Sequence, residues 1–198
     1  MSAASPWLLR WVHLIAPRGS VLDVAAGTGR HTTWLAERGH RVTAVDRDAA
    51  AMGLLADRAE VVVADLESDP WPLAGRAFDA VVVTNYLWRP LFGPLAAALA
   101  PGGVLFYETF AIGNESVGRP ARREFLLGPG ELLAAFPGLR IVAFEDGFLD
   151  APERFVQRVA AVRETGAAGR PRYPLAPSGT GPGSVESAGS RTRAGTRA

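Results

Sequence analysis

Short apolar runs alternate with helix-like segments along most of this chain, at intervals of roughly 20 residues. The runs are nearly continuous in Val, Leu and Ile, which is typical of strands covered on both faces of a parallel sheet. They are VLDVA, RVTAVD, VVVADL, FDAVVVTN, GGVLFYETF, LRIVAF and RFVQRVAAV. The segments predicted as crossover helices are Thr32–Arg38, Ala49–Asp57, Pro90–Ala100 and Pro129–Phe136. The pattern therefore predicts an α/β fold with helices on a mostly parallel sheet.

The last two apolar runs are joined differently from the others. Between them lies EDGFLDAPE, which has turn-forming residues and no helical period. Two strands joined without a crossover form a hairpin, so one strand near the C-terminus is predicted to be antiparallel.

The chain is long enough for one sizeable core, and we expect a single domain over residues 1–165. A helix over about 5–16 is predicted to pack on it through an apolar face of Trp7, Leu8, Trp11, Leu14 and Ile15. This segment is interrupted by charge, too short to span a bilayer and without a cleavage pattern, so we expect a cytoplasmic protein. Residues 166–198, rich in Gly, Pro, Ser and Arg, are predicted to be a disordered tail.

Composition excludes several chemistries. The chain has no cysteine, and its histidines, His13, His31 and His40, lack metal-ligand spacing, so no metal site is expected. All 21 basic residues are arginine, which excludes a phosphate-loop lysine and a lysine imine. The tail holds a net charge of +4 and leaves the folded part near −3, which disfavours a nucleic-acid partner.

The stretch VLDVAAGTGRH indicates a nucleotide site. Its glycines Gly27 and Gly29 follow an apolar run, as in loops that turn from a strand into a helix beneath a nucleotide. Asp23 would repel a pyrophosphate held on this loop. A carboxylate there suits a cationic ligand such as S-adenosylmethionine, with its ammonium and sulfonium groups. The alternative is that Asp23 only caps the turn or the following helix.

Two further acids end the next two predicted strands. Asp46 ends RVTAVD, where it can accept hydrogen bonds from both ribose hydroxyls, although it could also cap the next helix, a role better suited to Asp48. Asp65 ends VVVADL, where it can accept from the adenine amine while Leu66 borders the ring. Carboxyl ends of parallel strands share one edge, so the three acids are predicted to line one site.

On these motifs the chain resembles the class I S-adenosylmethionine-dependent methyltransferases. DVAAGTG, VTAVD, VVVADL, FDAVVVTN and LAPGGVLFYETF match their successive motifs, across roughly residues 7–164. The resemblance implies a Rossmann-like seven-stranded sheet with an antiparallel last strand, and cofactor roles for Asp23, Gly27, Gly29, Asp46 and Asp65. Ala25 departs from the family, which usually has a glycine there. GRHTTWLAERGHRVTAVDRD and YETF look most like bacterial small-molecule methyltransferases of the tellurite-resistance type.

Candidates for the methyl-acceptor site follow the fourth and fifth predicted strands. Asn85 could bind the cofactor's amino group, and Tyr86 or Trp88 could wall an acceptor pocket, unless Trp88 only packs its loop onto the sheet. Glu108 would be costly to bury alone, so it either pairs with Arg119, Arg122 or Arg123, or serves as a base or acceptor ligand. The segment AIGNESVGRPARREFLLGPGEL has no apolar period and is predicted to form a lid.

The leading hypothesis is methyl transfer to a small molecule by in-line displacement, with Tyr86 and Glu108 as candidate catalytic residues. The alternatives are methylation of RNA or protein, and a non-catalytic S-adenosylmethionine-binding protein. A nucleobase acceptor is disfavoured because Tyr86 and Leu87 stand where amine-methylating enzymes of nucleic acids have prolines. An NAD(P)-linked oxidoreductase is opposed by Asp23, and by Thr32 in the place of a third glycine.

Overall fold

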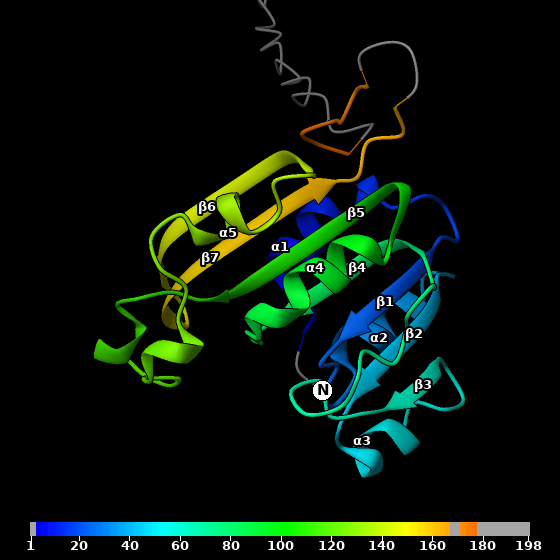
Figure 1. The fold of residues 1–198 in the computed structure, drawn as a ribbon, viewed down its shortest axis with the longest axis horizontal. Helices are drawn as coiled ribbons and strands as arrows, with labels where there is room; N and C mark the ends of the chain where they lie inside the picture. The colour runs from blue at the N-terminus through cyan, green and yellow to red at the C-terminus, as the bar shows by residue number, and fades with distance from the viewer. Residues whose placement is uncertain (1–2, 167–170, 178–198) are drawn as a thin grey trace, which may run out of the picture.

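The computed structural model describes residues 3–166 and 171–177. Its centre is a seven-stranded sheet of order β3-β2-β1-β4-β5-β7-β6 (Figure 1). The strands are β1 (Ser20–Val24), β2 (Arg41–Asp46), β3 (Glu60–Val63), β4 (Phe78–Thr84), β5 (Leu99–Phe110), β6 (Arg140–Asp150) and β7 (Glu153–Val162). The first five pair in parallel, while β7 runs antiparallel to both β5 and β6. The predicted fold is confirmed.

The predicted hairpin is formed by β6 and β7, with strands longer than the sequence pattern indicated. Most of EDGFLDAPE is strand, and the turn is confined to Ala151 and Pro152. Cross-strand contacts explain the extension: Phe148 lies opposite Phe155 with ring centroids 4.9 Å apart, and Arg158 bonds Glu145. These cross-strand contacts stabilise the pairing, so polar and turn-type residues continue the two strands.

Helices cover both faces of the sheet (Figure 1). They are α1 (Pro6–Trp11), α2 (Arg30–Ala36), α3 (Ala49–Gly53), α4 (Phe92–Ala97) and α5 (Glu131–Ala135), with one-turn 3₁₀ helices at Val12–Leu14, Arg89–Leu91, Asn114–Ser116 and Arg123–Phe125. All four predicted crossover helices exist, but with different bounds. The one predicted from Pro129 begins only at Glu131, because Gly130 before it has a positive φ of 66°.

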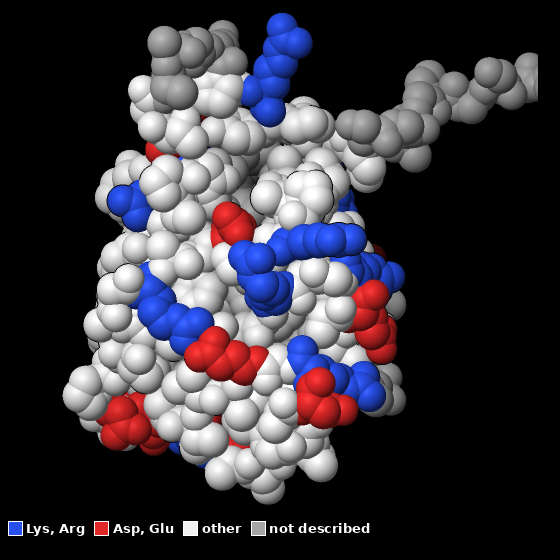
Figure 2. Space-filling model, turned by 90° about the vertical axis from the view of Figure 1, so that its right-hand side faces the viewer, with Lys and Arg blue, Asp and Glu red and all other residues white. Residues whose placement is uncertain are grey.

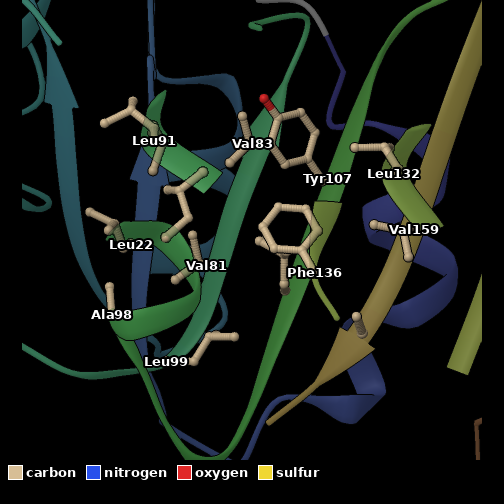
Figure 3. Close-up of a cluster of buried hydrophobic side chains, with 14 of the residues drawn as sticks. Leu22, Val81, Val83, Leu91, Ala98, Leu99, Tyr107, Leu132, Phe136 and Val159 are labelled. Carbon is tan, nitrogen blue, oxygen red and sulfur yellow. The ribbon is translucent and has the colours of Figure 1, made fainter. Parts of the chain in front are cut away.

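Alternate residues along the strands point to opposite faces of the sheet and belong to two separate hydrophobic cores. Leu22, Val81 and Tyr107 point toward α4 and α5, where the ring of Tyr107 meets that of Phe136 (Figure 3). Val21, Val82 and Phe106 point to the opposite face, against α1 and α2. This alternation is the period-two pattern of a sheet buried on both faces, so the strands can carry functional residues only at their ends.

The N-terminal helix packs on the domain as predicted, although it is shorter than expected. Ser5 caps it by accepting from the N–H of Trp7, whose indole Nε1 donates to the carbonyl of Val159 at 3.1 Å. Part of the predicted tail also contacts the domain: Tyr173 packs against this core, and the Pro174 carbonyl lies 2.9 Å from Nε2 of His13. Residues 167–170 and 178–198 lie outside the described residues, and the boundary at 165 stays a prediction.

Two surface properties bear on partners. On the face shown in Figure 2, basic and acidic side chains are interspersed, unlike the one-sided basic surface of many nucleic-acid-binding domains. In the part of the chain that the structure describes, no helix has the length and apolar character needed to cross a bilayer.

Candidate active site

Strand order reverses between β1 and β4, and open α/β sheets bind ligands beside the carboxyl ends of their strands at such a point. Two cavities lie along this edge. The Asp46 cavity, about 310 Å³, is lined by Ala25, Asp46, Arg47, Ala64, Asp65, Leu66, Glu67 and Tyr86. The Phe110 cavity, about 340 Å³, is lined by Arg47, Glu67, Asn85, Tyr86, Leu87, Thr109, Phe110, Pro120 and Phe125. Arg47, Glu67 and Tyr86 line both, so the two cavities are neighbours.

The loop after β1 is built on left-handed residues. Ala25, Gly27 and Gly29 have φ values of 52°, 56° and 75°. A Cβ on Gly29 would lie 2.4 Å from Leu55 Cδ2, so this glycine also permits the close packing of α2 against Leu55. Ala25 stands where the resembled family has glycine and adopts the strained conformation that glycine would relieve. The unusual alanine therefore leaves the loop geometry in place.

The predicted nucleoside-binding acids lie together in the Asp46 cavity. Asp46, at the end of β2, accepts hydrogen bonds from the N–H groups of Gly27 at 2.8 Å and Asp48 at 2.9 Å. Asp65 accepts from the N–H of Glu67 at 3.0 Å, and Leu66 lines the same space. Asp48, by contrast, caps α3 through the N–H of Ala51, as expected. The backbone bonds orient the Asp46 carboxylate and leave it with further acceptor capacity.

Asp23 is more deeply buried than a direct ligand contact requires. Its side chain is only 2% exposed, and Oδ2 accepts a 2.6 Å hydrogen bond from the Thr32 hydroxyl. Burial raises the pKa of Asp23 to about 6, while the hydrogen bonds from Thr32 and the charge of Arg30 act in the opposite direction. Asp23 is absent from the lining of the Asp46 cavity. It therefore presents a negative potential behind the loop, and its contact with a ligand stays a prediction.

Beside Asp23 lies a residue to which the sequence assigned no role. His31 Nε2 accepts the N–H of Ser5 at 3.1 Å, and Nδ1 lies 4.0 Å from Asp23 Oδ1 and 3.4 Å from the Thr84 hydroxyl. Burial, with the charge of Arg30, lowers the pKa of His31 to about 3. The ring is therefore neutral with its proton on Nδ1, and it connects the N-terminal segment to β1 and β4.

Tyr86 lies between the two cavities with an unpartnered hydroxyl. Among the described residues, nothing hydrogen-bonds this buried oxygen, although its backbone carbonyl accepts from Tyr107 at 3.0 Å. Burial and the nearby carboxylates of Glu67 and Asp65 raise the pKa of the phenol above its usual value. At neutral pH Tyr86 is therefore a hydrogen-bond donor available to a ligand. Neighbouring Asn85 lines the Phe110 cavity, with a φ of 56° that asparagine tolerates.

The arginine partners predicted for Glu108 are wrong. Its side chain is 1% exposed and ion-paired with Arg154 at 3.4 Å and Arg158 at 3.5 Å, while Ser5 Oγ donates to it at 3.2 Å. The sequence pointed to Arg119, Arg122 and Arg123, which are exposed instead. β7 pairs antiparallel with β5 and sets Arg158 directly opposite Glu108, a register that strand patterns alone do not specify. Glu108 lines neither cavity and has the surroundings of a structural ion pair.

The segment predicted as a lid, residues 111–132, borders the Phe110 cavity through Pro120 and Phe125. Arg89 fastens it to the domain by donating to the carbonyls of Glu124 and Leu126 and pairing with Glu131 at 2.6 Å. Trp88 packs against the core and lies outside the lining of these two cavities, whereas Tyr86, the other predicted wall residue, lines both. The sequence analysis did not predict that Arg47 and Glu67 line the site. The one sequence feature that could have indicated them is their position directly after Asp46 and Leu66.

Comparisons with known proteins agree with this geometry. Residues 21–103, which contain the glycine loop and all three acids, match the family described as "Methyltransferase domain". Over these residues, which are less than half of the chain, the sequence is similar to that methyltransferase domain family. The family uses S-adenosylmethionine as its methyl donor, in agreement with the cofactor expected from Asp23, Asp46 and Asp65. No curated protein sequence matches the chain.

The methyltransferase fold is shared with solved structures at low sequence identity. TehB from Haemophilus influenzae superposes on this chain with a TM-score of 0.70 and 16% sequence identity. The superposition covers 83% of this chain and 64% of TehB, so this chain spans less than two thirds of that protein's length. For a SAM-dependent methyltransferase from Methanosarcina mazei the TM-score is 0.65 and the sequence identity 16%, with 82% of this chain and 99% of that protein covered. For a TehB-like methyltransferase from Corynebacterium glutamicum the TM-score is 0.56 and the sequence identity 20%, with 75% of this chain and 82% of that protein covered. These likenesses concern the fold.

Proposed function

We propose that the chain transfers a methyl group from S-adenosylmethionine, held in the Asp46 cavity, to a small molecule held in the Phe110 cavity. The observation that carries this proposal is the pair of adjoining cavities at the strand-order reversal, with Arg47, Glu67 and Tyr86 lining both. Each has the volume of a small-molecule site. Solved structures of similar fold include a glycopeptide N-methyltransferase and a coclaurine N-methyltransferase bound to N-methylheliamine, in keeping with a small acceptor.

The residues present fit the cofactor. When bound, S-adenosylmethionine supplies a methyl group already activated by a sulfonium. Asp46 would accept from the ribose hydroxyls and Asp65 from the adenine amine, with Leu66 against the ring. Asp23 contributes a negative potential that favours a cationic ligand at the glycine loop. The unpartnered Tyr86 hydroxyl supplies a donor where the two cavities meet.

The protein's contribution to the chemical step would be alignment and exclusion of water. Phe110, Pro120 and Phe125 give the acceptor cavity an apolar wall. Among its lining residues Glu67 is the one carboxylate, and it is exposed. Tyr86 keeps its proton because its pKa is raised, so it can orient an acceptor atom by donating to it. This arrangement suits an acceptor that is nucleophilic without strong deprotonation.

Calorimetric titration of the purified protein with S-adenosylmethionine, S-adenosylhomocysteine and NAD tests the cofactor. Binding of the first two and not of NAD is the expected result. Pools of small molecules are then screened for formation of S-adenosylhomocysteine, with RNA and peptide pools in parallel. Turnover with RNA or peptides alone would contradict the small-molecule proposal, and binding of NAD alone would contradict the cofactor.

A further inference from the structure

Phe125 lines the Phe110 cavity and is held in place through the residues on either side of it. Arg89 donates from Nη1 to the carbonyl of Glu124 at 2.8 Å and from Nη2 to the carbonyl of Leu126 at 2.9 Å. These two residues come directly before and directly after Phe125 in the chain. One guanidinium therefore fixes the backbone on both sides of a residue that walls the cavity.

The guanidinium of Arg89 is itself anchored by a carboxylate. Its Nε and Nη2 donate to Oε1 and Oε2 of Glu131, the first residue of α5, at 2.6 and 3.0 Å. Two such bonds to one carboxylate are the strongest geometry for an arginine ion pair. The hydrogen bond from Arg89 holds the pKa of Glu131 below its usual value, so the pair is charged at neutral pH. The wall residue is thus fixed by a charged clamp.

The Arg89 side chain also joins the two chain segments that wall the cavity. Arg89 lies three residues after Tyr86, in the loop that follows β4. Tyr86 and Leu87 line the cavity from this loop. Pro120 and Phe125 line it from the segment that follows β5. The position of one wall against the other therefore depends on the hydrogen bonds of Arg89.

The Phe110 cavity is small and mainly apolar. Its volume of about 340 Å³ is near the lower end of the range for small-molecule sites, roughly 300–1,000 Å³. The rings of Tyr86, Phe110 and Phe125 line it together with Leu87 and Pro120. Aromatic ligands pack well against such rings. A compact ring compound suits this space, and a larger one requires a wall to move.

We propose that Arg89 selects the methyl acceptor by size, because it holds Phe125 against the loop after β4 and so limits the Phe110 cavity to compact ring compounds. Arg89 lines neither cavity and acts through Phe125, so it is a positioning residue. Without its hydrogen bonds the wall moves outward and admits larger ring compounds. This inference rests on the proposed function, which places the acceptor in this cavity.

The size limit of the cavity can be measured without an acceptor, because the chain has no cysteine. Leu87→Cys places one thiol in the cavity lining, and its rates of modification by methyl and benzyl methanethiosulfonate report which sizes enter. Adding Arg89→Gln should speed the benzyl reaction at least about tenfold, on the scale of a lost charge-assisted hydrogen bond, and the methyl reaction less than about threefold. Arg163→Gln should change neither rate, because Arg163 also donates to two carbonyls but lines neither cavity.

Thermal unfolding of each variant shows whether the fold is kept. If Arg89→Gln does not fold, Arg89→Lys carries the test, because lysine keeps the charge and lacks the planar fork. The lysine variant should change the ratio of the two rates in the same direction, though by less. Equal acceleration of both reagents, or an unchanged ratio, would overturn the role of Arg89 and leave the proposed function standing.

Transfer assays connect the size limit to the choice of acceptor. With acceptors found in the small-molecule screen, Arg89→Gln should raise kcat/KM for compounds of two or three fused rings about tenfold relative to one-ring compounds. The affinity for S-adenosylhomocysteine should stay unchanged. A changed labelling ratio with an unchanged acceptor preference would overturn selection by size alone. A wild-type protein that does not bind S-adenosylhomocysteine would overturn the proposed function and, with it, this inference.

Discussion

The N–H of Gly27 donates a 2.8 Å hydrogen bond to Oδ2 of Asp46, so the glycine loop after β1 is tied to the end of β2. Replacing Asp46 by alanine should weaken binding of S-adenosylhomocysteine by about 1–3 kcal/mol, through lost charge-assisted hydrogen bonds and a loosened loop. Calorimetry measures the change. Unchanged affinity would show that the ribose is bound elsewhere.

Asp48→Ala is the matched control, because this aspartate lies two residues away and caps α3 without lining the Asp46 cavity. Its loss should lower the free energy of unfolding by about 1 kcal/mol and leave ligand affinity unchanged.

Affinity for S-adenosylmethionine should rise with pH. The pKa of Asp23 in the folded protein is about 6, so the carboxyl is mostly neutral at pH 5 and mostly charged at pH 7. A cationic ligand favours the charged form, and the affinity should increase about tenfold over this interval. Titrations at half-unit steps would show it. Asp23→Asn should flatten the profile, and a wild-type profile that is already flat would contradict the role of Asp23.

Tyr86→Phe should separate stability from function. The variant removes a buried hydroxyl that has no partner among the described residues, so the free energy of unfolding should stay the same or rise by up to about 1 kcal/mol. If the hydroxyl donates to the acceptor, KM for the acceptor should increase while cofactor affinity changes little. A KM equal to that of the wild type would show that Tyr86 only walls the cavity.

Glu108→Ala should act on stability. Arg154 and Arg158 are largely buried and would lose their ion pairs with this carboxylate. The free energy of unfolding measured in urea should fall by about 3 kcal/mol. Glu145→Ala breaks a pair with the same Arg158, but Glu145 is 40% exposed and should cost less than about 1 kcal/mol. Normal stability of Glu108→Ala together with lost turnover would restore Glu108 as a catalytic candidate.

Gly29→Ala should destabilise the protein by about 2–3 kcal/mol, because the new Cβ meets Leu55 and the left-handed backbone strains alanine. Gly27→Ala shares the positive φ but has nothing within 4 Å of its Cβ, so it should cost about 1 kcal/mol. In a double-mutant cycle, Leu55→Ala should recover part of the Gly29→Ala loss. Additive losses would contradict the contact.

Local patterns were enough to predict the architecture and the nucleoside end of the site. Continuous apolar strands, a G-x-G loop and the acids Asp46 and Asp65 are all readable over a few neighbouring residues, and parallel strands bring their ends to one edge. The helix preceding β1 was readable in the same way, from the apolar face of Trp7, Leu8 and Trp11.

Contacts between distant segments were not predictable in this way. The partner of Glu108 depends on the register of β7, and the environment of His31 depends on where Ser5 passes over the sheet. The burial of Asp23 behind its loop depends on Thr32, a residue that the sequence pattern marked only as a missing glycine. Each of these requires tertiary placement that periodicity and motif spacing do not encode.

The place of β7 between β5 and β6 also affects how the protein is made. β5 and β6 are synthesised first and do not pair with each other, so the edge of β5 has no neighbour until residues 153–162 leave the ribosome. An open strand edge of this kind can pair with other chains. The nascent polypeptide is therefore most exposed to misassembly when nearly all of the domain has already been synthesised.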